Sequence, residues 1–210
     1  MRLYDYAASG NCFKVRLLLA LLGREYERVP VDIFAGETLT AEFAALNPAR
    51  TTPVLELDDG TPLAESAAIL WYLAEGSDYL PGNGFQHARV LQWLCFERAL
   101  TPAVAGARFQ IMTGRTDAET PILLDNGRRA LATLERRLDG RDWVVLDTPT
   151  IADIALFGYT HVADDAGLDL AAHPAICAWL DRVRALPGYV NDLVPYPANA
   201  RPGASRSIYD

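Results

Sequence analysis

The chain has 210 residues, of which 50% are hydrophobic and 22% charged, and its formal net charge at pH 7 is −8. This composition excludes a disordered chain, and no uncharged apolar run approaches the roughly 20 residues that cross a bilayer, so we expect a soluble globular protein without a membrane partner. The acidic excess repels a phosphate backbone, which disfavours nucleic acid as a partner.

The N-terminal segment predicts a short strand followed by a helix. Residues 3–6 form the strand, and Asp5 stands where a signal peptide would have its apolar stretch, so we expect a cytoplasmic protein. Small residues at 7–10 lead into a helix over residues 11–22, which ends at Gly23 because glycine readily adopts the left-handed conformation found after helices.

The following elements continue to alternate between strand and helix. They are a strand at residues 27–32, a helix at 40–46, strands at 54–57 and 61–63, and a helix at 66–74. Pro30 and Pro62 lack an N–H group, which predicts that their strands lie at sheet edges. Asp59-Gly60 supplies the tight turn of a hairpin. The predicted order, βαβαββα, is that of a thioredoxin-like domain.

The segment Leu80-Pro81-Gly82-Asn83-Gly84 indicates a linker, after which helical periodicity replaces the alternation. We therefore predict an α/β thioredoxin-like domain over residues 1–80 and an all-helical domain over residues 85–210. The expected helices are one from about residue 90 to 112 that Pro102 kinks or interrupts, one at 122–138, one that begins at a capping box of Thr150 and Asp153, and one that begins near Pro174.

The cysteines and histidines do not form a metal or disulfide pattern. Cys12, Cys95 and Cys177 are an odd number at wide spacings, which fits neither a disulfide framework nor a zinc site. With three histidines in the whole chain, we expect no metal.

The turn into the first helix, Ser9-Gly10-Asn11-Cys12, is the first candidate site. Redox thioredoxins have two cysteines here, where helix N-terminal amides stabilise a thiolate. Ser9 stands in place of the first cysteine, and its hydroxyl can donate a hydrogen bond to a thiolate that a ligand brings, which lowers the pKa of that thiol. The alternatives are that Ser9 or Asn11 only caps the helix and that Cys12 is a small buried apolar residue.

Two further signals lie beside predicted strands and helices. Thr52-Pro53 directly precedes a strand, where a cis proline in this fold would leave the backbone of the preceding residue to pair with an extended peptide. Glu65-Ser66 begins a helix whose free amides and dipole suit a carboxylate. The alternative for Glu65 and Ser66 is a plain helix cap.

Taken together, these residues resemble the cytosolic glutathione transferases, of the serine type found in theta-like and delta-like classes. The stretches that carry the resemblance are residues 9–15 (SGNCFKV), 47–55 (NPARTTPVL), 65–73 (ESAAILWYL) and 149–153 (PTIAD). No tyrosine matches the catalytic tyrosine of the alpha, mu and pi classes. Asn11 occurs where some bacterial disulfide-reducing relatives have asparagine.

The resemblance implies a role for each matching residue. Ser9 would activate the glutathione thiol with Asn11 beside it, and Thr52 would pair its backbone with the cysteinyl part of glutathione ahead of cis Pro53. The remaining residues of the expected glutathione site are Arg50 near the glycyl carboxylate, for which an exposed arginine is the alternative, and Glu65 and Ser66 at the γ-glutamyl end. A small hydrophobic electrophile would bind between the domains, near Arg108, Phe109 and Met112, although these side chains could equally serve packing.

Three functions remain open from the sequence. The first is a detoxifying glutathione S-transferase, the second a glutathione-dependent disulfide or peroxide reductase, and the third a non-catalytic glutathione-binding module. The resemblance also implies a homodimer in which the first domain of one subunit contacts the helices of the other. In each case glutathione is the expected co-substrate or ligand.

Overall fold

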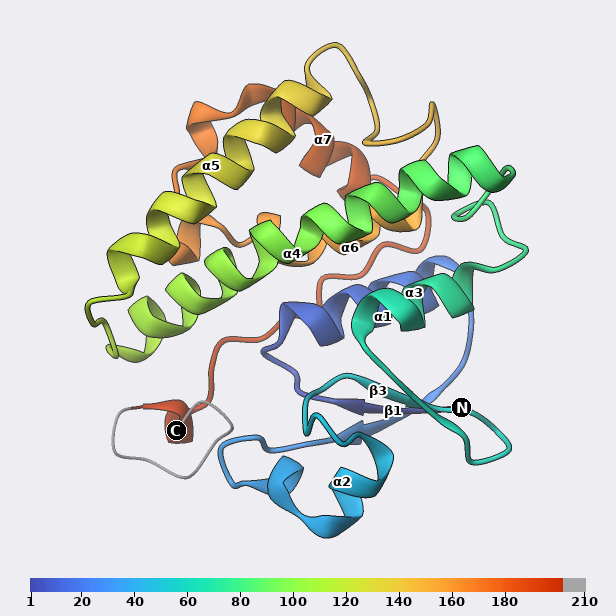
Figure 1. Cartoon of the computed structure of the whole chain (residues 1–210), viewed down its shortest axis with the longest axis vertical. Coiled ribbons are helices and arrows are strands. Elements are labelled where there is room, and N and C mark those ends of the chain that lie inside the picture. Colours follow the sequence, from blue (N-terminus) through green and yellow to red (C-terminus); the bar gives the residue numbers. More distant parts are fainter. Residues whose placement is uncertain (202–210) are drawn as a thin grey trace.

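The computed structural model describes residues 1–201, and its N-terminal half contains the predicted βαβαββα order (Figure 1). The elements are β1 (Arg2–Asp5), α1 (Gly10–Leu21), β2 (Glu27–Pro30), the short 3-10 helix η1 (Glu37–Leu39), α2 (Ala41–Leu46), β3 (Val54–Glu56), β4 (Pro62–Ala64) and α3 (Ser66–Ala74). Each predicted element is confirmed, with bounds that shift by one or two residues.

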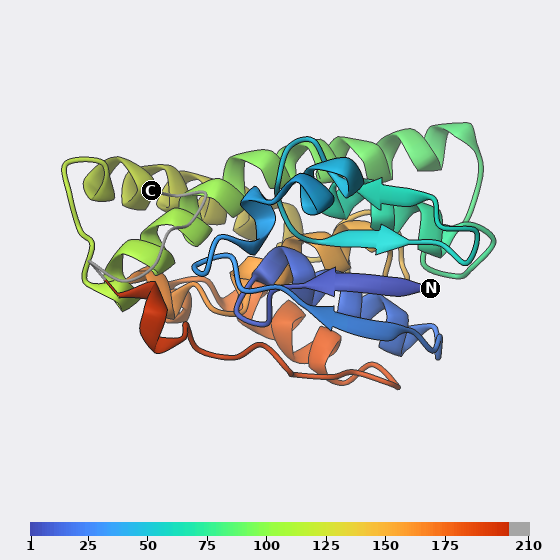
Figure 2. The same ribbon diagram turned by 90° about the horizontal axis from the view of Figure 1, so that it is seen from below.

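The four strands form one mixed sheet in the order β2-β1-β3-β4. Strand β2 runs parallel to β1, whereas β3 is antiparallel to both β1 and β4. Figure 2 shows the strands side by side, with β2 and β4 at the two edges. Pro30 and Pro62 therefore lie on edge strands, as predicted, because neither can donate to a ladder on both sides.

The sheet lies between α1 and α3 on one face and α2 on the other (Figure 1). Most apolar side chains of α1, among them Phe13, Val15 and Leu17, are fully buried because this helix packs against α3 and also against α6 of the helical half. Helix α1 ends as predicted, with Gly23 in the left-handed region at a φ of 62°.

The helical half contains four long helices in the described part of the chain. They are α4 (Gly84–Thr113), α5 (Thr120–Leu138), α6 (Ile151–Thr160) and α7 (Pro174–Arg184), with short 3-10 helices η2 (Asp164–Ala166), η3 (Leu170–Ala172) and η4 (Ala198–Ala200). The prediction of an all-helical second half is confirmed for residues up to 201; the predicted domain extends to residue 210, and its last nine positions lie outside the described residues.

Helix α4 continues through Pro102, so of the two expected outcomes, a kink or an interruption, the interruption is wrong. Pro102 is exposed and removes one backbone hydrogen bond, whereas its neighbours Leu100, Ala103 and Val104 are buried against the helices around them. Most helical stability in proteins comes from such packing of an apolar face, which here offsets the loss of one bond.

The predicted capping box at the start of α6 is confirmed. Thr150 accepts from the amide of Ala152 at 3.2 Å, and Asp153 accepts from the amide of Thr150 at 2.9 Å. The other carboxylate oxygen of Asp153 accepts from the amide of Val144 and from Nε1 of Trp179, at 2.9 and 3.0 Å. One buried carboxylate thus joins α6, α7 and the loop between α5 and α6.

After α7, residues 185–201 return to the N-terminal half, and we name them the C-terminal segment. Figure 1 shows this segment running from α7 past α1 to the loop side of the sheet. Nε of Arg16 donates to both carboxylate oxygens of Asp192 at 2.9 Å, and the amide of Val194 donates to the carbonyl of Ala7 at 3.4 Å. None of the helices within residues 1–201 has the length and apolar character to cross a membrane.

Candidate functional site

Ser9 is the N-cap of α1 and lies on a small cavity. Its Oγ accepts from the backbone amide of Cys12 at 3.3 Å, which satisfies one of the free amides of the first helical turn. A hydroxyl that accepts in this way keeps its own proton to donate. The cavity has a volume of about 90 Å³ and is lined by Tyr6, Ser9, Asn11, Ile33, Thr51, Thr52, Tyr159 and Tyr196.

Cys12 lies behind Ser9 and is fully buried. Burial raises the pKa of its thiol to about 11, and the negative charge of Asp5 acts in the same direction. Sγ of Cys12 also accepts from the amide of Tyr6 at 3.4 Å. Cys12 is therefore a neutral thiol at pH 7 and a packing residue, which agrees with the alternative that the sequence left open.

Thr51 and Thr52 form the opposite wall of the small cavity. The bond between Thr52 and Pro53 is cis, as expected from the sequence. The segment is held from behind by the nearly fully buried Asn47, whose Nδ2 donates to the carbonyl of Thr51 at 2.8 Å and to its hydroxyl at 3.1 Å. Pro53 itself is buried below the cavity.

The strand register brings the three predicted glutathione-binding stretches to one end of the sheet. Tyr4 pairs with Val54, and Val54 pairs with Ala64. The chain segments that follow β1, precede β3 and follow β4 therefore all lie at the same end of the sheet. They include Ser9, Thr52 and Ser66, respectively.

Glu65 and Ser66 line a separate cavity at this end of the sheet. It has a volume of about 320 Å³ and lies between α3 and α4, with Trp71, Leu94 and Glu97 among its lining residues. Glu65 is exposed and has a φ of 67°, and Ser66 is the first residue of α3. The remaining predicted glutathione contact, Arg50, is exposed and lines neither this cavity nor the one at Ser9.

A third cavity adjoins the cavity at Ser9, because Asn11, Tyr159 and Tyr196 line both. Its volume is about 570 Å³, and its other lining residues are Thr101, Pro102, Ala105, Gly106, Phe109, Gln110, Arg115, Asp117, Glu119 and Leu123. It lies between the two halves of the chain, and both aromatic and polar side chains line it. We call it the interdomain cavity.

The three residues predicted near the electrophile occupy different places. Phe109 lies on the wall of the interdomain cavity. Met112 is 41% exposed and does not line it. Arg108 is buried beneath the Ser9 turn, where Nη1 donates to the carbonyl of Ala8 and Nε to Asp165, both at 3.1 Å.

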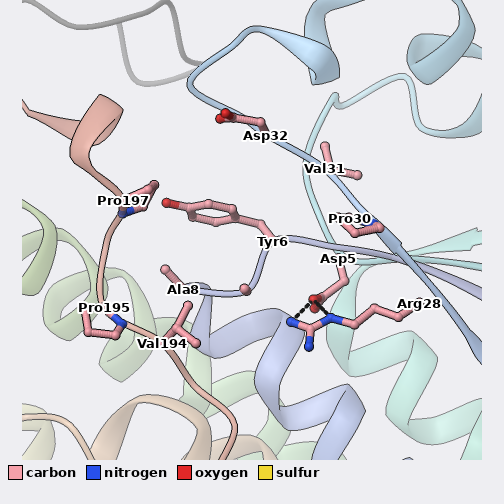
Figure 3. A pocket seen from close by; sticks show the side chains of 11 residues that line it. Asp5, Tyr6, Ala8, Arg28, Pro30, Val31, Asp32, Val194, Pro195 and Pro197 are labelled. Atoms are coloured by element: carbon pink, nitrogen blue, oxygen red, sulfur yellow. Dashed lines mark hydrogen bonds and ion pairs between the residues drawn. The ribbon is translucent and has the colours of Figure 1, made fainter.

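A fourth cavity lies on the other side of Tyr6, between the end of β2 and the C-terminal segment (Figure 3). It has a volume of about 420 Å³. In Figure 3 the ring of Tyr6 lies between Val31 and Pro197, and Arg28 pairs with Asp5 at one end. Tyr6 is thus a common wall of this cavity and the cavity at Ser9, so the C-terminal segment approaches the candidate site from outside.

Sequence reasoning missed Tyr159 and Tyr196 as residues of the candidate site. Tyr159 was hidden within the uniformly buried helix α6. Tyr196 stands between Pro195 and Pro197, and a lone aromatic residue between prolines in a segment without periodicity was the only signal. Within residues 1–201 no three histidine, cysteine or acidic side chains gather as a metal site would require.

Family models match both halves of the chain. Residues 8–75 match the N-terminal domain of glutathione S-transferases, and residues 91–187 match the C-terminal domain of the same family. The chain is 35% identical over 204 residues to a maleylacetoacetate isomerase of Rhizobium meliloti, covering 86% of this chain and 89% of that protein. It is 28% identical over 193 residues to the disulfide-bond oxidoreductase YfcG of Escherichia coli, covering 87% and 89%.

A solved structure has the same fold over nearly the whole chain. A glutathione S-transferase of Pseudomonas fluorescens Pf-5 superposes with a TM-score of 0.89 at 44% sequence identity, covering 92% of this chain and 98% of that one. Two family models that together cover most of the chain, with this relative, establish the assignment. The chain belongs to the glutathione S-transferase family.

Proposed function

We propose that this protein binds glutathione across the end of the sheet that carries Ser9, Thr52 and Ser66. We propose further that Ser9 stabilises the glutathione thiolate for attack on a small electrophile in the interdomain cavity. The observation that carries the proposal is the shared wall of two cavities. A sulfur atom in the cavity at Ser9 would face a substrate in the interdomain cavity across Asn11, Tyr159 and Tyr196. Membership of the glutathione S-transferase family supports glutathione as the ligand.

The cysteinyl part of glutathione would pair with the backbone of Thr52, at the edge of the cavity at Ser9. Its γ-glutamyl end would extend to the start of α3, where the amides and hydroxyl of Ser66 receive the carboxylate and the exposed carboxylate of Glu65 receives the ammonium group. Arg50, exposed beside this end of the sheet, would approach the glycyl carboxylate.

Ser9 would then favour the anionic form of the bound thiol. Its Oγ accepts from the amide of Cys12, which leaves its own proton to donate. A hydrogen bond to the charged form lowers a pKa, and each unit represents about 1.4 kcal/mol. The buried Cys12 thiol, whose pKa is raised to about 11, would not compete as a nucleophile at pH 7.

The charges of the interdomain cavity favour a neutral electrophile. Its charged side chains are one cation, Arg115, and two anions, Asp117 and Glu119. Arg108, which the sequence placed here, is engaged with Asp165 below the cavity. A site for a small dicarboxylate would be expected to have surplus positive charge, so we place isomerisation of such acids, the reaction in the name of the Rhizobium relative, behind conjugation.

Asn11 supports a second candidate, reduction of a mixed disulfide or a peroxide. It lines both cavities, and its amide can donate to the attacking sulfur or to the sulfur that leaves. In that reaction the glutathione thiolate attacks a disulfide sulfur, a new S–S bond forms, and the other thiol leaves. The similarity to YfcG agrees with this candidate.

The test is to replace Ser9 with alanine and compare three reactions. We expect Ser9→Ala to raise the pKa of the enzyme-bound glutathione thiol, followed by ultraviolet absorbance, and to slow conjugation of a chlorinated nitroaromatic by about 10- to 100-fold. The same preparations are assayed with a glutathione mixed disulfide and with a cis-unsaturated dicarboxylic acid. If the wild type turns over one of these two substrates faster than the nitroaromatic, that reaction replaces conjugation as the proposed function.

A matched control separates catalysis from helix capping. Ser9→Ala also removes an N-cap, which costs about 1 kcal/mol. Thr40 caps α2 in the same way, accepting from the amide of Phe43 at 3.1 Å. It lines neither the cavity at Ser9 nor the interdomain cavity. If Ser9→Ala keeps the activity and thiol pKa of the wild type, or changes them no more than Thr40→Ala does, the role of Ser9 is rejected.

We also propose a homodimer formed through α3 and α4. Large apolar side chains are exposed on these helices: Tyr72 at 43%, Phe85 at 75% and Leu91 at 50%. A second copy there would border the cavity of Glu65 and Ser66, which the same helices form. Light scattering of the wild type and of Leu91→Arg measures the mass; a wild type that is monomeric at micromolar concentration rejects the proposal.

A further inference from the structure

Tyr196 occupies the boundary between the cavity at Ser9 and the interdomain cavity, although it comes from the last described part of the chain. Its ring packs edge-on against Phe109, with centroids 5.5 Å apart, and the guanidinium carbon of Arg108 lies 4.8 Å from the ring centroid. A molecule that reaches from Ser9 toward Phe109 must pass Tyr196. A molecule bound across the two cavities would therefore lie against Tyr196.

The C-terminal segment is fixed on both sides of Tyr196. Before it, Asp192 accepts from Arg16, whose side chain is 1% exposed. After it, Nδ2 of Asn199 donates to Asp32 at 2.7 Å, and Ala200 is fully buried. Anchors on either side leave the tyrosine little freedom to withdraw, which is the preorganisation that a catalytic contact requires.

The hydroxyl of Tyr196 has a proton to give. Burial raises the pKa of this phenol, and the positive charge of Arg108 beside the ring opposes the shift. Because the pKa remains above its ordinary value, the phenol is neutral at pH 7 and its hydroxyl keeps a proton that it can donate.

We propose that Tyr196 is a catalytic residue whose hydroxyl donates to the oxygen on which negative charge develops when the glutathione sulfur attacks the electrophile. This inference rests on the proposed function. With a chlorinated nitroaromatic, the S–C bond forms, the π electrons move onto a nitro oxygen near Tyr196, and they return as the C–Cl bond breaks and chloride leaves. With an α,β-unsaturated ketone, the S–C bond forms and the charge moves to the carbonyl oxygen, which is then protonated from solvent.

The test compares Tyr196→Phe with the wild type on two kinds of electrophile. For a nitroaromatic halide or an unsaturated ketone we expect kcat to fall about 100- to 1000-fold, the loss typical of one donor to a developing oxyanion. For an alkyl iodide, whose charge develops on the departing halide and on no oxygen, we expect a change of less than about twofold. The pKa of the bound glutathione thiol should stay that of the wild type, because Ser9 is intact.

Tyr189→Phe is the matched control. Tyr189 lies on the same C-terminal segment and also interacts with an arginine, Arg184, but it packs edge-on against Phe157 with centroids 5.9 Å apart and lines neither cavity. Its variant should conjugate all three electrophiles at the wild-type rate. A loss in Tyr189→Phe equal to that in Tyr196→Phe would mean that the segment is only being loosened, and would overturn the inference.

The remaining outcomes distinguish failure of this inference from failure of the proposed function. If the wild type conjugates the nitroaromatic and Tyr196→Phe does so at the same rate, or loses equal activity toward the alkyl iodide, this inference fails while the proposed function stands. If Tyr159→Phe gives the selective loss instead, the donor is the other shared tyrosine and the inference fails. If the wild type has no activity toward any electrophile, the proposed function fails and this inference fails with it.

Discussion

Nη1 of Arg108, near the C-terminal end of α4, donates to the carbonyl oxygen of Ala8, the residue directly before Ser9, at 3.1 Å. The same guanidinium pairs with Asp165 through Nε at 3.1 Å. The helical half of the molecule therefore holds the turn that carries the candidate catalytic serine. The sequence placed Arg108 in the electrophile site, and its geometry instead suits a positioning role.

Replacement of Arg108 by methionine should destabilise the protein and loosen the Ser9 turn. The change leaves the carbonyl of the fully buried Ala8 without its donor and Asp165 without its cation, and we expect a loss of about 2–3 kcal/mol in the free energy of unfolding. Urea unfolding measures the loss, and absorbance of bound glutathione should record a higher thiol pKa.

Arg129→Met is the control for that variant. Arg129 pairs with Asp125 on α5 at 2.6 Å, but its side chain is 76% exposed, so we expect a change within about 0.5 kcal/mol. Equal effects of the two substitutions would contradict the positioning role of Arg108.

Substitution of Gly10 by alanine should disturb the contact between the two halves. A Cβ at this position would lie 2.5 Å from the carbonyl oxygen of Gly158 and 2.8 Å from the ring of Tyr159, because α1 and α6 approach closely there. Overpacking of this kind costs about 1–3 kcal/mol. Since Tyr159 lines both cavities, KM for glutathione and kcat for conjugation should change together with thermal stability.

Gly84 offers the matched position for this prediction. It also begins a helix, yet nothing lies within 4 Å of the Cβ that would be added. Gly84→Ala should leave activity unchanged and stability equal or slightly higher, because alanine has the better helix propensity. A Gly10→Ala variant that behaves like Gly84→Ala would show that α1 and α6 can move apart at no cost.

The N-terminal half could be predicted from the sequence because its signals are local. The turn at Gly60, the edge prolines and the helix stop at Gly23 each act within a few residues, and the structure has each where it was expected. The capping box of α6 is local in the same sense, with both partners inside one turn.

Pro102 and Tyr196 could not be predicted, for opposite reasons. Pro102 is a strong local signal that distributed packing along α4 overrides. Tyr196 has no local signal, since its place depends on contacts such as that between Arg16 and Asp192, which are separated by 176 residues in the chain. Pair contacts at that separation leave no trace in periodicity or turn chemistry.

The substitution Asp153→Asn should destabilise the helical half without changing the candidate site. Both carboxylate oxygens accept hydrogen bonds, from the amides of Val144 and Thr150 and from Nε1 of Trp179, in a fully buried position. An amide nitrogen in place of one oxygen would face a donor, and we expect a loss of about 2–4 kcal/mol in chemical unfolding. The same change at Asp181, 76% exposed and paired with Arg184 on the surface, should cost less than about 0.5 kcal/mol.

His161 should make the stability of the protein depend on pH between about 4 and 6.5. Burial lowers its pKa from 6.5 to about 4, and the charges of Arg184 and Arg108 act in the same direction. In this window the unfolded chain binds a proton that the folded chain does not, so stability is fully present above about pH 6.5 and falls as the pH decreases toward 4. With about 1.4 kcal/mol for each pH unit, the loss is on the order of 3 kcal/mol.

The measurement is the free energy of unfolding in urea at a series of pH values, for the wild type and for His161→Phe. The imidazole ring stacks nearly parallel on the ring of Phe157, with centroids 4.7 Å apart. Its Nδ1 donates to the carbonyl oxygen of Phe157 at 2.8 Å. Phenylalanine keeps the stacking but removes that bond and the titration, so the variant should be less stable above pH 6.5 and lose less than the wild type on acidification. Because the carboxylates titrate alike in both proteins, their contribution cancels in the difference, and two parallel profiles would contradict a buried neutral histidine.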